Sequence, residues 1–190
     1  MEIKRIILES MAVKQAIINS EDLNKKIEFV TSQIVNCYKQ GGTVYFCGNG
    51  GSAADAQHIA AELSGRFYYD RPPLAAEALH VNTSYLTAVA NDYSYDEIYA
   101  RYIRGVAKKG DVLVGISTSG NSKNIIKAFD AANELGAITI ALTGESGGKM
   151  IDIANTTINV PSSDTPRIQE SHIMIGHIIC QYVESEIFPQ

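Results

Sequence analysis

The sequence predicts an α/β fold in which helices cover both faces of a parallel sheet and a pair of helices precedes that sheet. Two helical stretches occupy the first forty residues, apolar runs of strand length recur after them, and further helical stretches separate these runs. This alternation is typical of parallel strands that are buried on both faces. We expect one domain over 1–190, with the helical pair in 1–40 and the α/β core in 41–190.

The helical pair is predicted at residues 4–18 and 21–39. Ser20 precedes the second helix as a cap, and Glu21 and Asp22 favour its first turn. One stripe of this helix is apolar, at Leu23, Ile27, Val30 and Ile34. This spacing predicts a helix face that packs against the rest of the fold.

Apolar runs of strand length predict the sheet. Four of them lie at 44–46, 111–116, 138–142 and 158–160, and a weaker one lies at 75–79. Helices are expected between them at 52–65 and 122–135, and Gly136 ends the second of these helices. Its polar face is expected to carry Lys123, Asn124 and Lys127.

The last helix is predicted from Thr165, with Pro166 in its first turn, to about Glu186. Between Ile173 and Ile179 it is apolar on nearly every side, and a surface helix does not tolerate such a composition. Two interpretations remain open at this point, a deeply buried helix and a helix that packs against another subunit.

Composition excludes several classes of protein. A net charge of -5 opposes a nucleic-acid-binding surface, which needs clustered Lys and Arg. Residues 1–10 mix charges with a short apolar run, unlike a secretion signal, and no apolar stretch reaches transmembrane length. Cys37, Cys47 and Cys180 lack Cys-x-x-Cys spacing, so they are expected to be buried apolar side chains in a reducing compartment. We expect a cytoplasmic protein with no nucleic-acid or membrane partner.

The first of two unusual strand-to-helix turns is Gly48-Asn49-Gly50-Gly51-Ser52. In an open parallel sheet, such turns at the carboxyl edge are where ligands bind. The glycines allow positive φ and close approach of a ligand, and Ser52 is a candidate helix cap. A tight turn alone explains two glycines but not three together with Asn49.

The second unusual turn, Ser117-Thr118-Ser119-Gly120-Asn121-Ser122, places four hydroxyls around a glycine at a helix N-terminus. Hydroxyl donors, free backbone N–H groups and the positive end of the helix dipole all favour an anion. A phosphate monoester fits this combination. The simpler alternative is that Asn121 or Ser122 only caps the helix.

Two helices carry candidate catalytic or metal-binding residues. His58 and Glu62 are four residues apart on one helix face, and Gln169 and His177 share a flank of the last helix. Two imidazoles, a carboxylate and an amide suit a divalent transition metal. Glu62 and His177 also supply the base and the acid that an aldose–ketose isomerisation needs. For each pair alone, an ordinary surface ion pair or a partly buried contact remains the simpler interpretation.

In order and spacing, four segments between about residue 20 and the carboxyl end are similar to the phosphoheptose isomerase branch of the sugar isomerase (SIS) family. They are Gly48 to Ser52, the run Asp55-Ala56-Gln57-His58 through Glu62, residues 110–122, and Arg167-Ile168-Gln169-Glu170 with the later His177. The resemblance implies a single SIS domain with a flavodoxin-like parallel sheet. It also implies conversion of sedoheptulose 7-phosphate to D-glycero-D-manno-heptose 7-phosphate through an enediol, for lipopolysaccharide, capsule or another glycan.

The resemblance further implies roles for individual residues. Those expected around the sugar phosphate are Asn49, Gly50, Gly51, Ser52, Asn91, Asp92, Ser117, Thr118, Ser119 and Ser122, with Arg66 assisting. One zinc ion per chain is expected on His58, Glu62, Gln169 and His177. Glu62 is the expected base, and Glu62 and Gln169 are also expected to contact the substrate. A homotetramer with active sites at subunit interfaces is implied as well. Pro166 departs from some relatives, which carry an acid at that place.

The main alternative is a non-catalytic adaptor of the same fold that binds a replication initiator protein. Such adaptors resemble this chain at both turns but lack the counterparts of Glu62 and His177. Dinucleotide binding is a weaker alternative: Gly48-x-Gly50-x-x-Ala53 fits the glycine fingerprint, but Glu77 falls inside a possible strand. Two further histidines match no functional position and are expected to be structural or surface residues, namely His80 and His172.

Overall fold

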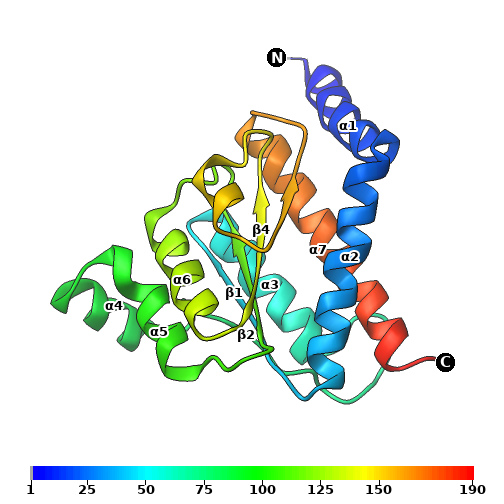
Figure 1. The fold of residues 1–190 in the computed structure, drawn as a ribbon. Coiled ribbons are helices and arrows are strands. Elements are labelled where there is room, and N and C mark those ends of the chain that lie inside the picture. The colour runs from blue at the N-terminus through cyan, green and yellow to red at the C-terminus, as the bar shows by residue number, and fades with distance from the viewer. Residues whose placement is uncertain (1) are drawn as a thin grey trace.

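The computed structural model describes residues 2–190, which form seven α-helices and a five-stranded sheet (Figure 1). The strands are β1 (Val44–Gly48), β2 (Ala76–Ala78), β3 (Val112–Ile116), β4 (Ile138–Thr143) and β5 (Thr156–Asn159). The helices are α1 (Ile3–Asn19), α2 (Glu21–Lys39), α3 (Gly51–Ser64), α4 (Thr83–Asp92), α5 (Ile98–Val106), α6 (Lys123–Glu134) and α7 (Thr165–Ile187), with short 3-10 helices η1 (Tyr95–Glu97) and η2 (Gly148–Asp152).

The sheet is parallel throughout, with strand order β2-β1-β3-β4-β5. All five predicted strands are confirmed, including the weak one. The chain runs from β1 to β2 on one side and then crosses to β3 on the other side of β1. The order therefore reverses between β1 and β3, and in open parallel sheets ligands bind in the crevice beyond the carboxyl ends of such a pair. Both unusual turns follow these two strands.

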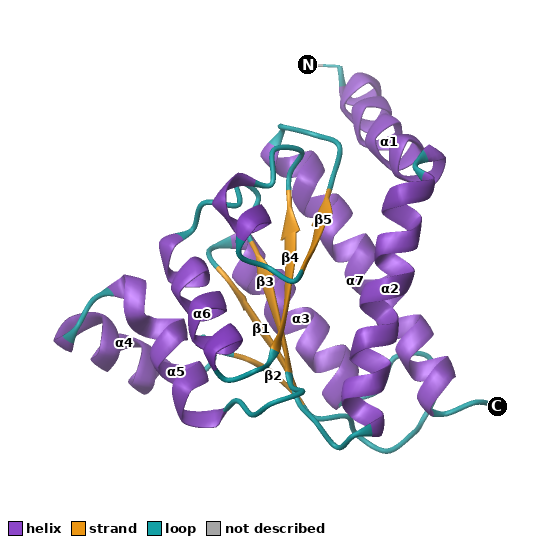
Figure 2. Ribbon diagram, in the orientation of Figure 1, coloured by secondary structure: helices purple, strands orange, loops and turns teal. Residues whose placement is uncertain are grey.

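Helices cover both faces of the sheet, as Figure 2 shows. Alternate strand residues serve the two faces: Phe46 and Val114 join the apolar cluster with α2, α3 and α7, whereas Tyr45 and Leu113 join the cluster with α5 and α6. Every residue of β1 and β3 is buried, which explains why the sequences of these strands are unbroken apolar runs. The predicted α/β fold is confirmed.

Helices α4 and α5, which lie between β2 and β3, are not among the predicted elements. In α4 only Val89 is buried, so no apolar stripe marks this helix in the sequence. Helix α5 does carry a stripe, with Ile98, Tyr99 and Ile103 buried, and its spacing was sufficient to predict it.

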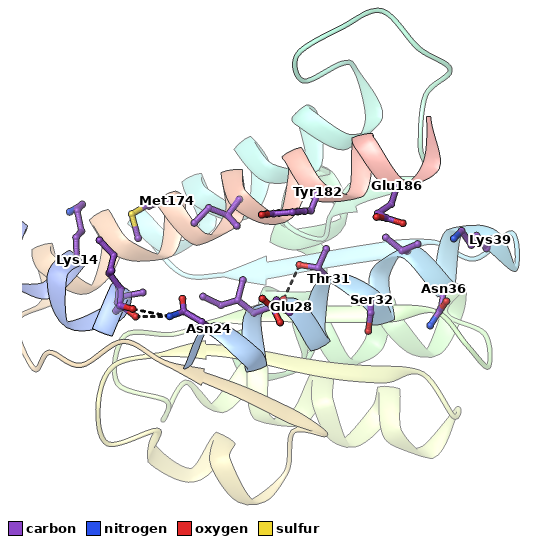
Figure 3. A pocket seen from close by; sticks show the side chains of 15 residues that line it. Lys14, Asn24, Glu28, Thr31, Ser32, Asn36, Lys39, Met174, Tyr182 and Glu186 are labelled. Carbon is purple, nitrogen blue, oxygen red and sulfur yellow. Dashed lines mark hydrogen bonds between the residues drawn. The ribbon is translucent and has the colours of Figure 1, made fainter. Parts of the chain in front are cut away.

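The interpretation of α7 as a buried helix is confirmed for one side of the helix, whereas packing of its other side against another subunit stays a prediction. Ile175 and Ile179 are buried in the core cluster, whereas Met174 and Ile178 line a groove on the outer side. The groove has a volume of about 690 Å³ and runs between α7 and α2 toward α1 (Figure 3). Among residues 2–190, no helix combines the length and apolar character that crossing a membrane requires.

Candidate active site

The two unusual turns meet at the carboxyl edge of the sheet. Asn49, after β1, exchanges two hydrogen bonds with Asn124 in the first turn of α6, at N···O distances of 3.0 and 2.9 Å. Tyr95 donates a third hydrogen bond to Asn49 at 3.1 Å. Asn124 is only 3% exposed, so its predicted place on the polar face of its helix is wrong. A buried amide needs partners, and this reciprocal pair supplies them while joining the β1–α3 turn to the β3–α6 turn.

The second unusual turn, residues 117–122, is called the hydroxyl turn. Its first residue is buried, and part of its middle is exposed to solvent. Ser117 is buried and its Oγ lies 2.9 Å from the Oγ of Ser122, whereas Ser119 is exposed. Ser122 occupies the N-cap position of α6, but its side chain makes no capping hydrogen bond. The first N–H groups of a helix have no intrahelical partner. In α6 the N–H of Ile125 donates to Oδ1 of Asn124 at 3.0 Å, so the backbone N–H groups of Lys123 and Asn124 are the ones available to an anion. A cavity of about 270 Å³ borders Thr118 and Ser119.

The glycine turn after β1 begins α3 differently from the prediction. Gly50 is the N-cap residue with φ 57°, a conformation that favours glycine. Ser52 lies inside the helix and is 4% exposed, so its predicted capping role is wrong. Gly51 lies against Gln169 of α7, because a Cβ at Gly51 would fall 2.6 Å from the amide nitrogen of Gln169.

His58, Glu62 and His177 come together although 119 residues separate the two histidines. The Nε2 atom of His58 lies 3.0 Å from Oε1 of Glu62 and 3.5 Å from Nε2 of His177. The side chains of His58 and Glu62 are 48% and 26% exposed, so small molecules can reach the cluster.

Close packing of α7 on α3 produces this cluster. A Cβ at Gly176 would lie 2.4 Å from Cδ1 of Ile59, so only glycine allows the two helices to approach this closely without repacking. Gly176 precedes His177, and Ile59 follows His58. The contact that brings the helices together therefore also brings the two imidazoles together.

The cluster fits a divalent metal ion in its donor chemistry. One ligand atom from each of the three residues lies within 4.8 Å of the others, and imidazole nitrogen with carboxylate oxygen is a common zinc donor set. Gln169, the fourth predicted ligand, is in contact with Gly51, about two helical turns from His177 along α7. A possible metal site is thus present, and the identity of the ion and the role of Gln169 stay predictions.

The remaining predicted residues lie at the margin of the site. Asn91 and Asp92 are exposed at the end of α4 and are hydrogen-bonded to each other at 2.9 Å. Tyr95 follows Asp92 by three residues and donates a hydrogen bond to Asn49, so this segment lies next to the glycine turn. Arg66 is exposed, and within residues 2–190 no hydrogen bond or ion pair joins its side chain to the other candidates.

Asp55 lies one turn before His58 and is absent from the predicted set. Its Oδ2 is buried with no hydrogen-bond partner in the described chain, and burial raises the pKa of this carboxyl to about 6, against the opposing charge of His58. Buried carboxyls with raised pKa values gather at functional sites. The spacing of Asp55 and His58 on one helix face was the signal available in the sequence.

His172 and the three cysteines are buried, as expected of structural residues, whereas the role of His80 stays a prediction. His172 is fully buried, its Nε2 lies 3.1 Å from the carbonyl oxygen of Thr143, and burial lowers its pKa to about 4. Glu77 lies within β2 and accepts a hydrogen bond from Tyr102 at 2.7 Å, which opposes a ribose-binding role. The cysteines are free and buried, at positions 37, 47 and 180.

A parallel sheet whose switch point carries a hydroxyl-rich turn at a helix N-terminus is typical of α/β proteins that bind phosphate-bearing ligands. The chain belongs to the SIS domain family, whose model matches residues 3–144. Proteins named phosphoheptose isomerase from Sulfurimonas denitrificans and Mycobacterium tuberculosis are 53% and 52% identical to it, over 98% and 97% of this chain and 95% and 94% of theirs.

A solved structure agrees with these sequence relatives. The phosphoheptose isomerase from Francisella tularensis superposes with a TM-score of 0.92 at 35% identity, over 96% of each chain. The predicted family, its phosphoheptose isomerase branch and the predicted class of enzyme, a sugar-phosphate isomerase, are confirmed.

Proposed function

We propose that this protein is an aldose–ketose isomerase that converts sedoheptulose 7-phosphate to D-glycero-D-manno-heptose 7-phosphate through an enediol. The observation that carries the proposal is the meeting of Glu62 with His58 and His177, in a chain that also holds an open hydroxyl turn at the sheet edge. The product is then available for lipopolysaccharide, capsule or another glycan.

The hydroxyl turn is the proposed site of the phosphate group. Ser117, Thr118, Ser119 and Ser122 supply hydroxyls, and the α6 N-terminus supplies backbone N–H groups. Charge-assisted hydrogen bonds to a dianion are about twice as strong as neutral ones. The neighbouring turn, with Asn49 to Ser52, is proposed to contact the sugar, together with Asn91, Asp92 and Arg66.

The sugar-contacting turn and the histidine cluster lie along the same helix. His58 follows Gly51 by seven residues of α3, which corresponds to about 10 Å along the helix axis. In sedoheptulose 7-phosphate, five carbon atoms, C3 to C7, lie between the reacting C2 and the phosphate group. An extended substrate of this kind suits a site in which the phosphate is held at the sheet edge and proton transfer takes place further along α3.

Glu62 and His177 are the proposed proton-transfer residues. The Glu62 carboxylate takes a proton from C1 of the ketose and returns it to C2 of the enediol, while His177 moves a proton between the two oxygens. Each step is balanced, because the proton taken from carbon returns to carbon and no oxidant is needed. Isomerisation therefore leaves both groups in their starting states.

We propose that His58, Glu62, Gln169 and His177 hold one zinc ion per chain. Such an ion supplies Lewis-acid polarisation of the substrate oxygens that carry the developing charge. A carboxylate has two oxygens, so Glu62 can accept a carbon-bound proton at one oxygen while the other faces the ligand cluster. Without the ion, Nε2 of His58 lies 3.0 Å from Oε1 of Glu62, a contact that orients this carboxylate.

The proposed assembly is a homotetramer with active sites at subunit interfaces, in the cytoplasm and with no nucleic-acid or membrane partner. Only Ile17 of α1 is buried, whereas Ile3, Ile7 and Met11 are 68%, 55% and 58% exposed. The apolar groove between α2 and α7 adjoins this helix (Figure 3). Exposed apolar surface of this kind supports association between subunits. Light scattering tests this, with an expected mass of four times 20.6 kDa.

A direct assay tests the proposed reaction. The purified protein is incubated with sedoheptulose 7-phosphate, and formation of the aldose is followed by ¹³C NMR, with zinc content measured on the same sample. Turnover that chelation abolishes and added zinc restores supports both the reaction and the metal. Absence of turnover in zinc-loaded protein overturns the proposal and favours the adaptor alternative, for which binding to a replication initiator is the measurement.

A further inference from the structure

A fully buried ion pair lies beside the catalytic cluster. Arg71, in the loop after α3, donates from Nε to Oε1 of Glu184 in α7 at 3.1 Å, and the two side chains are 2% and 1% exposed. Replacing a buried ion pair by apolar side chains often leaves stability unchanged or improved. Stability alone therefore does not account for this pair, and its contacts point to another role.

Arg71 binds the end of the helix that carries Glu62. Its Nη2 donates to the carbonyl oxygen of Glu62 at 2.9 Å, and its Nη1 donates to those of Leu63 at 2.7 Å and Gly65 at 3.0 Å. The last carbonyl groups of a helix have no intrahelical partner, and the guanidinium supplies one for Glu62, adds one for Leu63 and also binds Gly65, the C-cap residue of α3. The backbone of Glu62 is thereby fixed.

Glu184 binds the loop that covers the second half of the cluster. Its carboxylate accepts hydrogen bonds from the backbone N–H groups of Phe67 at 3.0 Å and Tyr68 at 2.8 Å. These bonds place the ring of Phe67 with its centroid 5.8 Å from that of His177. Glu184 also follows His177 by seven residues, so the two side chains lie on the same face of α7, two turns apart.

We propose that Arg71 and Glu184 are positioning residues that fix Glu62 and His177 relative to each other, and that Phe67 transmits this constraint to His177. The inference rests on the proposed function. Neither member of the pair touches the reacting atoms, and their effect passes through the backbone of Glu62 and the ring of Phe67. Partners that orient metal-binding or catalytic side chains typically contribute 10- to 100-fold in activity or metal affinity.

The test compares Glu184→Gln and Arg71→Lys with Val183→Ala. Val183 is fully buried in the core cluster on the same helix, so its truncation lowers Tm while it removes no hydrogen bond of Arg71 or Glu184. We expect the first two variants to lower kcat and zinc affinity by roughly 10- to 100-fold each, with KM changed less. Zinc affinity is measured by competition with a chromophoric chelator. Val183→Ala is expected to keep both values at a comparable loss of Tm.

Phe67→Leu tests whether Phe67 transmits the constraint to His177, in a protein that keeps the ion pair. This variant also provides the test if the Arg71 and Glu184 variants do not fold. We expect it to change the imidazole NMR signals of His177 and to lower kcat. Unchanged kcat, zinc affinity and His177 signals overturn the proposal, as do losses no larger than those of Val183→Ala. If the wild-type protein does not isomerise sedoheptulose 7-phosphate, the proposed function fails, whereas zinc affinity and the NMR signals still test the positioning role.

Discussion

The hydroxyl turn and the histidine cluster are built in opposite ways. The turn is one continuous segment, residues 117–122, and its main donors come from its own side chains and from the start of α6. The cluster joins His58 and His177 across 119 residues and exists only because α3 and α7 pack at Gly176. The proposed phosphate site is therefore a local property of the sequence, whereas the proposed catalytic cluster depends on tertiary packing.

The largest expected effect lies in the packed region. Glu62→Gln is expected to lower kcat by at least ~10²-fold, because an amide cannot take the proton from carbon. Substrate binding and fold are expected to persist. Steady-state kinetics measure the effect, and zinc content is determined on the same sample, so that loss of a ligand and loss of the base are distinguished. Glu134→Gln, at an exposed position on α6, is the matched control, and near-normal kcat in Glu62→Gln removes Glu62 from the mechanism.

Substitutions in the hydroxyl turn are expected to change KM rather than kcat. Removing the hydroxyls of Ser119 and Ser122 together raises KM for sedoheptulose 7-phosphate by roughly 10- to 100-fold, the scale for lost hydrogen bonds to a charged group. The free energy of unfolding should fall by about 1 to 2 kcal/mol, because Ser122 Oγ is the partner of the buried Ser117 hydroxyl and Ser119 Oγ accepts a hydrogen bond from the backbone N–H of Asn121. Unphosphorylated sedoheptulose is expected to be a very poor substrate, and the double variant should affect it less. Equal effects on both ketoses mean that the phosphate binds elsewhere, and a fall in kcat means that phosphate anchoring also aligns the reacting carbons.

A substitution at the helix contact tests whether packing builds the cluster. Gly176→Ala places a Cβ 2.4 Å from Ile59, which is 2% exposed, so we expect a loss of up to about 3 kcal/mol in the free energy of unfolding and weaker zinc binding. Gly105→Ala on α5 is the matched control, because its Cβ meets no atom within 4 Å and alanine favours a helix. Denaturant unfolding and chelator competition measure both. Normal zinc affinity in Gly176→Ala contradicts the dependence of the cluster on this contact.

The same contrast explains what the sequence predicts and what it misses. Strand-length apolar runs predict β1 and β3 because burial on both faces leaves no other pattern, and the turns after them are readable because their glycines and hydroxyls are contiguous. The hydrogen bond between Asn49 and Asn124 cannot be predicted from the sequence, since it links positions 75 residues apart. It also buries Asn124, which was expected to be exposed. The ion pair of Arg71 with Glu184 is missed for the same reason.

The smallest expected effect is on the pH dependence of stability. It distinguishes two histidines of α7, the structural His172 and the proposed catalytic His177. His172 is fully buried and its pKa is lowered to about 4, whereas it titrates near 6.5 in the unfolded chain. Between pH 6.5 and pH 4 the folded state therefore binds fewer protons than the unfolded state. The contribution of neutral His172 to the free energy of unfolding is fully present above pH 6.5 and is lost as the pH falls toward 4. Between pH 7 and pH 5 the loss attributable to His172 is about 2 kcal/mol. Urea unfolding at both pH values measures it, and His172→Gln should remove this part of the pH dependence, whereas His177→Gln, at the more open position, should retain it. An unchanged pH dependence in His172→Gln means that His172 accepts a proton in the folded protein.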